Sequence, residues 1–329
     1  MGAASETFSA RRLMFVCLVL AGLLNLVSAV APRWEVMIAA RALEGLALGG
    51  VPGTAMAYLA GEAPPERMGF AMGLNVSGAA FGGMMGRVAM GVLAQAASWR
   101  WAIGALSLVD LVAAVAFVLL LPRARNPSTE QASLARHVRA WRGALADPGL
   151  ASLYLAAFLA MGAFVAVYNY LGFRLATAPY NLSPARIGLI FLAYLVGMAA
   201  SSWAGASADR YGRRSILLMG AALALAGEAL TLARPLPAII AGVAILTGGF
   251  FVVHSVASGW VGRLAGAGRS HAASLYLLAY SGGASLLGSA GGWVWRSGGW
   301  PGLIGACAAA MLGVAALGAR LAPDRPAAT

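Results

Sequence analysis

Long apolar stretches recur along the chain and are separated by short segments rich in Arg, Pro and Gly. A helix needs about 20 mostly apolar residues to cross the hydrocarbon core of a bilayer, so each stretch predicts one transmembrane helix. The hydrophobicity is continuous and does not alternate, which excludes a transmembrane β-barrel. The predicted spans cover residues 13–31, 36–60, 69–95, 100–121, 149–172, 186–206, 215–233, 238–260, 271–295 and 300–321.

The composition indicates that lipid is the solvent for much of the outer surface. Hydrophobic residues make up 60% of the 329 residues and charged residues only 10%, whereas a soluble domain carries about 25% charged residues. Cys17 and Cys307 lie inside apolar stretches, so they indicate neither a disulfide framework nor a metal cluster. We therefore expect an all-α membrane protein with no cofactor, no metal ion and no catalytic residue.

The positive charge is explained by membrane topology. The net charge is +12, and the chain contains Arg but no Lys. A basic balance is also typical of nucleic-acid binding, but here the arginines lie in short loops between apolar spans. Their excess on one side places both termini in the cytoplasm. We expect a multi-pass protein of the bacterial cytoplasmic (inner) membrane whose partner is the lipid bilayer and not a nucleic acid.

One long loop divides the spans into groups of four and six. Within it Leu134, Val138, Trp141 and Leu145 recur at helical spacing. This pattern indicates an amphipathic helix on the cytoplasmic membrane surface; a solvated linker with accidental periodicity is the alternative. The predicted organisation is an N-terminal half at 1–121, a cytoplasmic loop at 122–148, a C-terminal half at 149–321 and a cytoplasmic tail at 322–329.

The two groups of spans contain an internal repeat. The segment 205–214 aligns with 2–11, and the first Gly, the acid and an Arg agree. Further along, Trp99 corresponds to Trp300, each at the start of the last span of its group. Parallel duplication of a helical bundle is a recurring plan of transporters and places a substrate cavity between the halves. If each half has six spans, the first half lacks two, which indicates a truncated product, a misassigned start codon or a genuine ten-span protein.

The best-defined motif is Gly-x-x-x-Asp-Arg-x-Gly-Arg-Arg in a short loop between two spans. It consists of Gly205, Asp209, Arg210, Gly212, Arg213 and Arg214. With this motif the chain resembles the major facilitator superfamily, a fold of two six-helix units. The resemblance implies that Asp209 and Arg213 form a charge relay that holds the cytoplasmic side closed. Simple anchoring by three arginines is the alternative.

A second motif, Arg41-x-x-x-Gly45-x-x-x-Gly49, is similar to the fourth-helix motif of the same family. In related antiporters the matching Arg is linked to proton coupling, which this resemblance implies for Arg41. An Arg inside a span is costly, so it should face a cavity or a partner, and Glu44 is suitably placed at i+3. A purely structural Arg–Glu pair is the alternative.

A third motif runs from residue 73 to Arg87 and resembles the fifth-helix motif of the antiporter branch, with Ala79 where Pro is usual. Together with segment 168–174 it is similar to the YnfM-like branch of drug and metabolite exporters. The glycines expected to permit close helix packing are Gly45, Gly49, Gly78, Gly82 and Gly83. The candidates for proton coupling or for lining a cavity are Arg41, Glu44, Arg87, Asp110 and Glu228, with His254 as a further polar residue inside a span.

These observations favour a monomeric secondary transporter that exports a small solute by alternating access against a proton gradient. The alternative is a truncated fragment that inserts in the membrane without transporting. An ATP-binding loop of the Gly-x-x-x-x-Gly-Lys-Ser/Thr type is absent from the sequence, and so are the usual patterns of an intramembrane enzyme. Aromatic residues such as Phe164 and Tyr168 are interpreted either as cavity lining or as helix packing.

Overall fold

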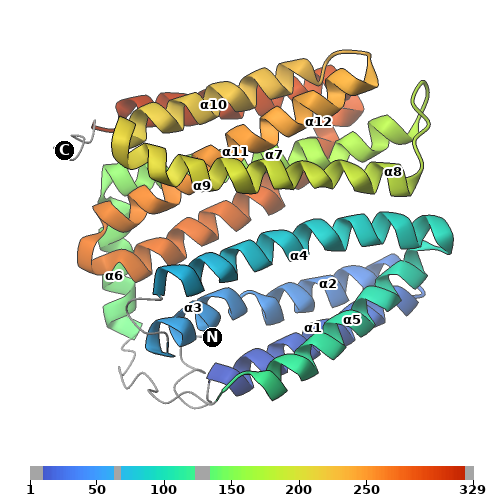
Figure 1. The fold of residues 1–329 in the computed structure, drawn as a ribbon, viewed down its shortest axis with the longest axis horizontal. Helices are drawn as coiled ribbons and strands as arrows, with labels where there is room; N and C mark the ends of the chain where they lie inside the picture. Colours follow the sequence, from blue (N-terminus) through green and yellow to red (C-terminus); the bar gives the residue numbers. More distant parts are fainter. Residues whose placement is uncertain (1–9, 63–67, 123–133, 323–329) are drawn as a thin grey trace. The chain divides into compact units, whose positions relative to one another are not determined.

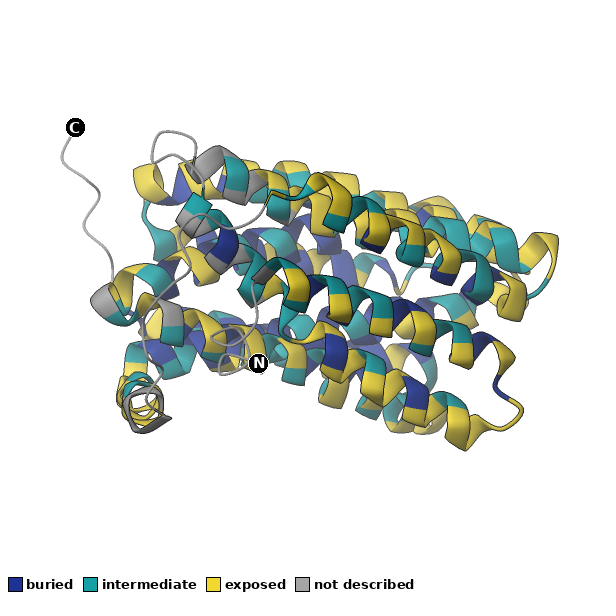
Figure 2. Cartoon of the chain, turned by 90° about the horizontal axis from the view of Figure 1, so that it is seen from below, coloured by how far each residue is buried: buried dark blue, intermediate teal, exposed yellow. Residues whose placement is uncertain are grey.

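A computed structural model describes residues 10–62, 68–122 and 134–322, and every regular element in this part of the chain is a helix. Helices suit these stretches because Ala and Leu favour them and because a helix pairs its backbone groups internally, as hydrocarbon requires. Six of the described helices are long and apolar enough to cross a membrane. Figure 2 shows how widely exposed residues occur along them, and Leu120, for example, is 82% exposed. The predicted all-α fold is confirmed.

The chain divides into two compact units, which are described separately. Unit 1 comprises residues 1–133 and 183–189. Its described helices are α1 (Ala10–Val30), α2 (Trp34–Leu48), α3 (Val51–Glu62), α4 (Met68–Ala96), α5 (Trp99–Leu120) and the short α8 (Pro184–Leu189). Within it α1 packs on α2 and α5, and α4 packs on α5 and α8. A close contact occurs at Gly91 of α4, where a Cβ would lie 2.5 Å from the carbonyl oxygen of Pro184.

Unit 2 comprises residues 134–182 and 190–329. Its described helices are α6 (Leu134–Ala146), α7 (Pro148–Ala176), η2 (Ile190–Ala193), α9 (Tyr194–Tyr211), α10 (Arg213–Leu230), α11 (Leu236–Leu264), η3 (Gly266–Gly268) and α12 (Arg269–Arg320). The most extensive contacts join α7 to α12, α10 to α11, and α9 to α11 (Figure 1). Small residues make these contacts close, as membrane helices require.

The long element α12 consists of two helices joined at Gly299. This residue has φ +59° and ψ −154°, a conformation that side-chain-bearing residues rarely adopt, and Pro301 follows it. The two parts of α12 therefore match the separate spans predicted at 271–295 and 300–321. The span predicted at 36–60 is divided between α2 and α3, and the span at 186–206 is covered by α8, η2 and α9.

The helix α6 occupies the part of the predicted loop that carries the amphipathic pattern. It runs across the direction of α7 in Figure 1, and it leaves the apolar side chains of Val138, Trp141 and Leu145 exposed. Asp147 separates the two helices and accepts a hydrogen bond from the backbone N–H of Leu150, 2.8 Å away, which caps α7. Residues 123–133 of the loop and 323–329 of the tail lie outside the described part, and a position of α6 at the membrane surface stays a prediction.

The internal repeat is visible in the helix boundaries. In unit 1, α1, α2, α4 and α5 begin at residues 10, 34, 68 and 99. In unit 2, α10, α11 and the two parts of α12 begin at residues 213, 236, 269 and 300. The displacement is 203, 202, 201 and 201 residues in turn, so the last four spans of unit 2 correspond in order to those of unit 1. Residues 2–9 of the first motif copy lie outside the described part.

Candidate functional site

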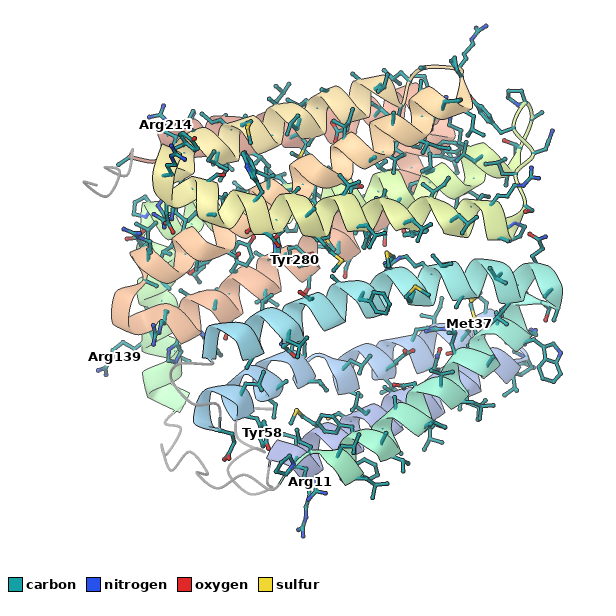
Figure 3. All side chains as sticks on the ribbon, in the orientation of Figure 1. Arg11, Met37, Tyr58, Arg139, Arg214 and Tyr280 are labelled. Carbon is teal, nitrogen blue, oxygen red and sulfur yellow. The ribbon has the colours of Figure 1, made fainter. Side chains whose placement is uncertain are left out.

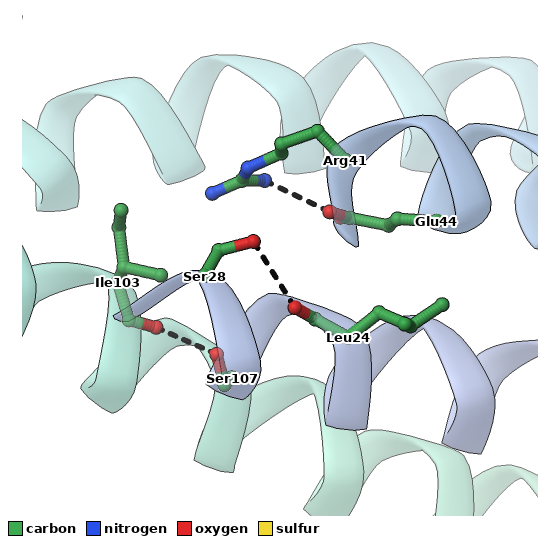
Figure 4. Close-up of polar contacts among 6 residues, drawn as sticks. All are labelled: Leu24, Ser28, Arg41, Glu44, Ile103 and Ser107. Atoms are coloured by element: carbon green, nitrogen blue, oxygen red, sulfur yellow. Dashed lines mark hydrogen bonds and ion pairs between the residues drawn. The ribbon is translucent and has the colours of Figure 1, made fainter. Parts of the chain in front are cut away.

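Arg41 and Glu44 form an ion pair on α2. Nη1 of Arg41 lies 2.9 Å from Oε2 of Glu44, and the two side chains are 43% and 16% exposed (Figure 4). Nearby, the fully buried hydroxyl of Ser28 on α1 donates to the carbonyl oxygen of Leu24. The spacing predicted from the sequence therefore does bring Arg41 and Glu44 together, while a role of the pair in proton coupling stays a prediction.

Two other candidates of unit 1 lie on different helices. Asp110 on α5 faces α1, because a Cβ on Gly22 would lie 3.0 Å from its carboxylate oxygen. Arg87 on α4 is exposed and donates from Nη1 to the carbonyl oxygen of Gly83, 3.0 Å away and one turn earlier. Each is positioned by its own helix, and the described contacts leave their functional roles as predictions.

The glycines of the two unit 1 motifs have open surroundings. A Cβ built on Gly45, Gly78 or Gly82 would meet no heavy atom of the described residues within 4 Å. At Gly83 the nearest such atom is Nη1 of Arg87, at 3.6 Å, and at Gly49 it is a carbonyl oxygen of the same helix. Close helix contacts in unit 1 are found instead at other glycines, and a packing role for these motif glycines stays a prediction.

The turn between α9 and α10 carries the loop motif. Gly212 links the helices with φ +87° and ψ 136°, which only Gly adopts readily. Asp209 accepts a hydrogen bond from Arg213, and Nη1 of Arg263 on α11 lies 3.9 Å from the same carboxylate oxygen. One carboxylate thus contacts arginines on two further helices. Arg214 lies at the same end of unit 2 (Figure 3).

The remaining residues of the motif have separate surroundings. The guanidinium of Arg210 lies over the ring of Tyr211, 5.2 Å from its centroid. A Cβ on Gly205 would meet no described heavy atom within 4 Å. The close helix approach implied for this Gly stays a prediction.

Glu228 is a fully buried acid on α10. Neither of its carboxylate oxygens has a hydrogen-bond partner among the described residues. An isolated charge in such surroundings is costly, and buried polar groups without partners are uncommon enough to be candidates for function. The structure places Glu228 away from the loop motif, near the opposite end of α10.

A group of aromatic rings meets in the middle of unit 2. The sequence predicts only its α7 residues, Phe164 and Tyr168. The ring cluster consists of Phe164 and Tyr168 on α7, Phe191 on η2, Tyr194 on α9, Phe250, Phe251 and His254 on α11, and Tyr276 and Tyr280 on α12. Phe164 and Phe250 stack with centroids 4.0 Å apart and planes inclined by 11°. Figure 3 shows Tyr280 partway along the helices of unit 2.

Two hydrogen bonds fix polar atoms of the ring cluster. The hydroxyl of Tyr276 lies 2.9 Å from Nδ1 of His254. The hydroxyl of Tyr168 lies 2.8 Å from Oγ1 of Thr247, which itself donates to a backbone carbonyl, so Tyr168 donates to Thr247. The helical spacing of Phe164 and Tyr168 was the available sequence signal; nothing in it indicated that α11 and α12 supply the facing rings.

These features suit binding and gating better than bond-breaking chemistry. Ring faces bind apolar groups, and an acid with two arginine partners can form and release ion pairs as helices move. Within the described residues no group of three or more His, Cys, Asp or Glu side chains could hold a metal ion.

Comparison with known proteins agrees with this interpretation. The sequence model of the Major Facilitator Superfamily matches residues 1–178 and again residues 174–329. The inner membrane transport protein YnfM of Escherichia coli is 39% identical over 97% of this chain and 77% of its own length. The uncharacterized MFS-type transporter YybF of Bacillus subtilis is 38% identical over 92% of this chain and 75% of its own length.

A solved structure supports the same fold. A crystal structure of the nucleoside transporter NupG superposes with a TM-score of 0.78, covering 96% of this chain and 85% of NupG at 14% identity. Since the relatives are named as transporters, the chain is a multi-pass membrane transporter and not an enzyme. The two family matches, the relatives and the shared fold together show that the chain belongs to the Major Facilitator Superfamily.

Proposed function

We propose that this transporter is a proton-coupled exporter of a small solute that works by alternating access in the bacterial inner membrane as a monomer. The observation that carries the proposal is the position of Asp209 between Arg213 and Arg263. Ion pairs between helix ends are stable in one arrangement of the helices and are broken in another, which is the property that a gate needs. Both termini and the turn that carries Asp209 are assigned to the cytoplasm.

Coupling to protons requires an ionisable group that differs between the two arrangements. The Arg41–Glu44 pair is the first candidate, because a proton on Glu44 would end the 2.9 Å ion pair and free the arginine. Asp110 and Glu228 are further candidates, and Glu228 could accept a proton without losing an existing hydrogen bond in the described structure. Arg87 would tune the local field.

Proton movement tests this function directly. The full chain is reconstituted in liposomes that contain a pH-sensitive dye, and a panel of small solutes is added across an imposed pH gradient. We expect at least one solute to cause proton movement that empty liposomes lack. We expect Arg41→Ala to reduce that movement by about ten-fold or more, because it removes the ion pair on which coupling would depend.

Arg33→Ala is the matched control, since Arg33 is an exposed residue just before α2 and lies outside the pair. It should retain the activity of the unchanged chain. Solute movement without proton movement would reject the coupling and leave a transporter. If no solute of the panel causes proton movement and none is transported, the proposed function is rejected.

A further inference from the structure

We propose that the ring cluster of unit 2 is a binding site for an uncharged, planar aromatic solute that carries a hydrogen-bonding group. This inference rests on the proposed function, because it names the class of solute that the exporter would bind. Four segments that are far apart in the sequence supply the rings: α7, the η2–α9 segment, α11 and α12. Packing between any one pair of helices does not explain why rings from all four segments meet.

The ring cluster lies in the middle of two long helices. Phe250 lies at the centre of α11, 14 residues from Leu236 and 14 from Leu264. Phe164 lies close to the centre of α7, which runs from Pro148 to Ala176. Because both helices have the length of a membrane span, the cluster lies near mid-membrane, the depth at which secondary transporters bind their substrates.

The ring cluster combines buried rings with rings that are partly exposed. Phe164, Phe250 and Tyr276 are 3%, 2% and 3% exposed, so they are held by packing. Five other rings are only partly buried, and we call them the rim of the cluster: Phe191, Tyr194, Phe251, His254 and Tyr280. Rings that are held by packing, next to rings that are partly exposed, form a preorganised surface, which lowers the entropy cost of binding. A planar ring can stack there with a centroid separation like those within the cluster, about 4.5–7 Å.

The imidazole of His254 gives the ring cluster a hydrogen-bonding group. His254 uses Nδ1 in its contact with Tyr276, which leaves Nε2, on the other edge of the imidazole, outside that contact. The ring of Tyr280 lies beside it, with centroids 4.7 Å apart. A ligand that stacks on Tyr280 would therefore bring its edge near an imidazole nitrogen that can exchange a hydrogen bond with it.

The positions of the acidic residues favour an uncharged ligand. The acidic residues in the described part of unit 2 are Asp147, Asp209 and Glu228. Asp147 caps α7, Asp209 lies at the α9–α10 turn, and Glu228 lies on α10, a helix that supplies no ring to the cluster. None of the three carboxylates has a described contact with a ring of the cluster that could replace the hydration of a cation, and burying an unpaired charge is costly. An uncharged ring is the better match.

Binding of three probes to the purified full chain in lipid nanodiscs tests the inference, with empty nanodiscs subtracted to remove partition into lipid. The probes are 2-naphthol, its saturated analogue decahydro-2-naphthol, and the planar cation 1-methylquinolinium. We expect 2-naphthol to bind about ten-fold more tightly than the saturated analogue, because stacking on protein rings contributes that much. It should also bind more tightly than the cation.

Variants connect the binding to the rim of the cluster. Tyr280→Leu and Phe251→Leu should each reduce the preference for 2-naphthol over its saturated analogue by several-fold, whereas Tyr280→Phe should preserve it. Phe173→Leu is the matched control, because Phe173 is 62% exposed on α7 and lies outside the cluster. Thermal unfolding of each variant identifies any that fail to fold, and Tyr280→Phe then remains as the paired comparison.

Equal binding of 2-naphthol and decahydro-2-naphthol would overturn the inference. A preference for 2-naphthol that neither Tyr280→Leu nor Phe251→Leu reduces would also overturn it. Tighter binding of the cation would reject an uncharged solute. This assay needs neither a gradient nor transport, so its outcome is independent of the proton measurement. A preference for 2-naphthol without any proton movement would support this site and reject the proposed function. Proton movement that only non-aromatic solutes cause would support the proposed function and reject this site.

Discussion

Arg174 and Trp300 converge on the last turn of α10 from two other helices. The guanidinium carbon of Arg174 lies 5.0 Å from the ring centroid of Trp300, and both side chains donate to the carbonyl oxygen of Thr231. A helix end leaves carbonyl groups unpaired, and a cation there also complements the helix dipole. Unit 1 has a related contact after α1, where Nη1 of Arg100 on α5 donates to the carbonyl oxygen of Ala31, 2.8 Å away.

Replacing Arg174 should therefore destabilise unit 2. Arg174→Leu removes the charged donor to Thr231 and to Ala233, and it leaves the buried carbonyl oxygen of Thr231 with Trp300 as its side-chain donor. We expect a loss of about 2–4 kcal/mol in the free energy of unfolding, measured by denaturation of the purified chain in detergent. Arg234→Leu is the control, since Arg234 is exposed on the same connection, and it should change stability by less than about 0.5 kcal/mol. Equal losses would contradict the role assigned to Arg174.

Replacing Asp209 should loosen the turn between α9 and α10. Asp209→Asn keeps the shape of the side chain and removes the charge that attracts Arg213 and Arg263. We expect backbone amide hydrogens near the turn to exchange several-fold faster, as followed by mass spectrometry of the intact membrane protein. Arg210→Gln should have little effect on this exchange, because Arg210 lies over Tyr211. Unchanged exchange in Asp209→Asn would show that the ion pairs do not hold the turn.

Gly227 should be intolerant of any side chain. A Cβ there would lie 2.3 Å from the backbone nitrogen of Leu246 on α11 and 2.6 Å from the carbonyl oxygen of Gly242, so the backbones would have to separate. We expect Gly227→Ala to cost at least about 1–3 kcal/mol of stability, seen as a lower thermal midpoint and lower yield. The control is Gly259→Ala on α11, where no described heavy atom lies within 4 Å. That variant should be neutral or more stable, since Ala favours helix over Gly.

The break in α12 gives a second paired test. Gly299→Ala forces a side chain into φ +59° and ψ −154°, which should cost about 1–3 kcal/mol. Gly298→Ala, one residue earlier, meets no described heavy atom within 4 Å and should be tolerated. Thermal unfolding of the two purified variants decides the matter. Equal stability would mean that the two parts of α12 can join through another backbone conformation.

Much of the fold could be predicted from the sequence, because each span is a local pattern of apolar residues. The loop motif is local as well, and Asp209 and Arg213, four residues apart, do form the expected pair. The same holds for Arg41 and Glu44, three residues apart. In each case the helix geometry between neighbours fixes the contact.

The rest depends on contacts between distant segments, which a local pattern does not contain. Arg263 reaches Asp209 from 54 positions away, and Trp300 reaches Thr231 from 69 positions away. Close backbone contacts occur at Gly227 and Gly283 of unit 2, which the packing prediction did not name, and the packing role of the glycine motifs of α2 and α4 stays a prediction. Whether a glycine lies at a close contact between two helices depends on how the helices are rotated about their axes, and hydropathy leaves that rotation undetermined.

The close backbone contacts at glycines restrict how the helices of unit 2 can move. At Gly283 a Cβ would lie within 3 Å of the backbone of Phe158, and at Gly249 within 3 Å of the backbone of Ala224, so main chains touch with no side chain between them. Helices that slide past one another need a layer of side chains that can change rotamer, and these glycine contacts lack such a layer. Shear between α7 and α12, or between α10 and α11, is therefore expensive. Any large displacement of this part of the molecule should be a tilt of the assembled helices as a single block.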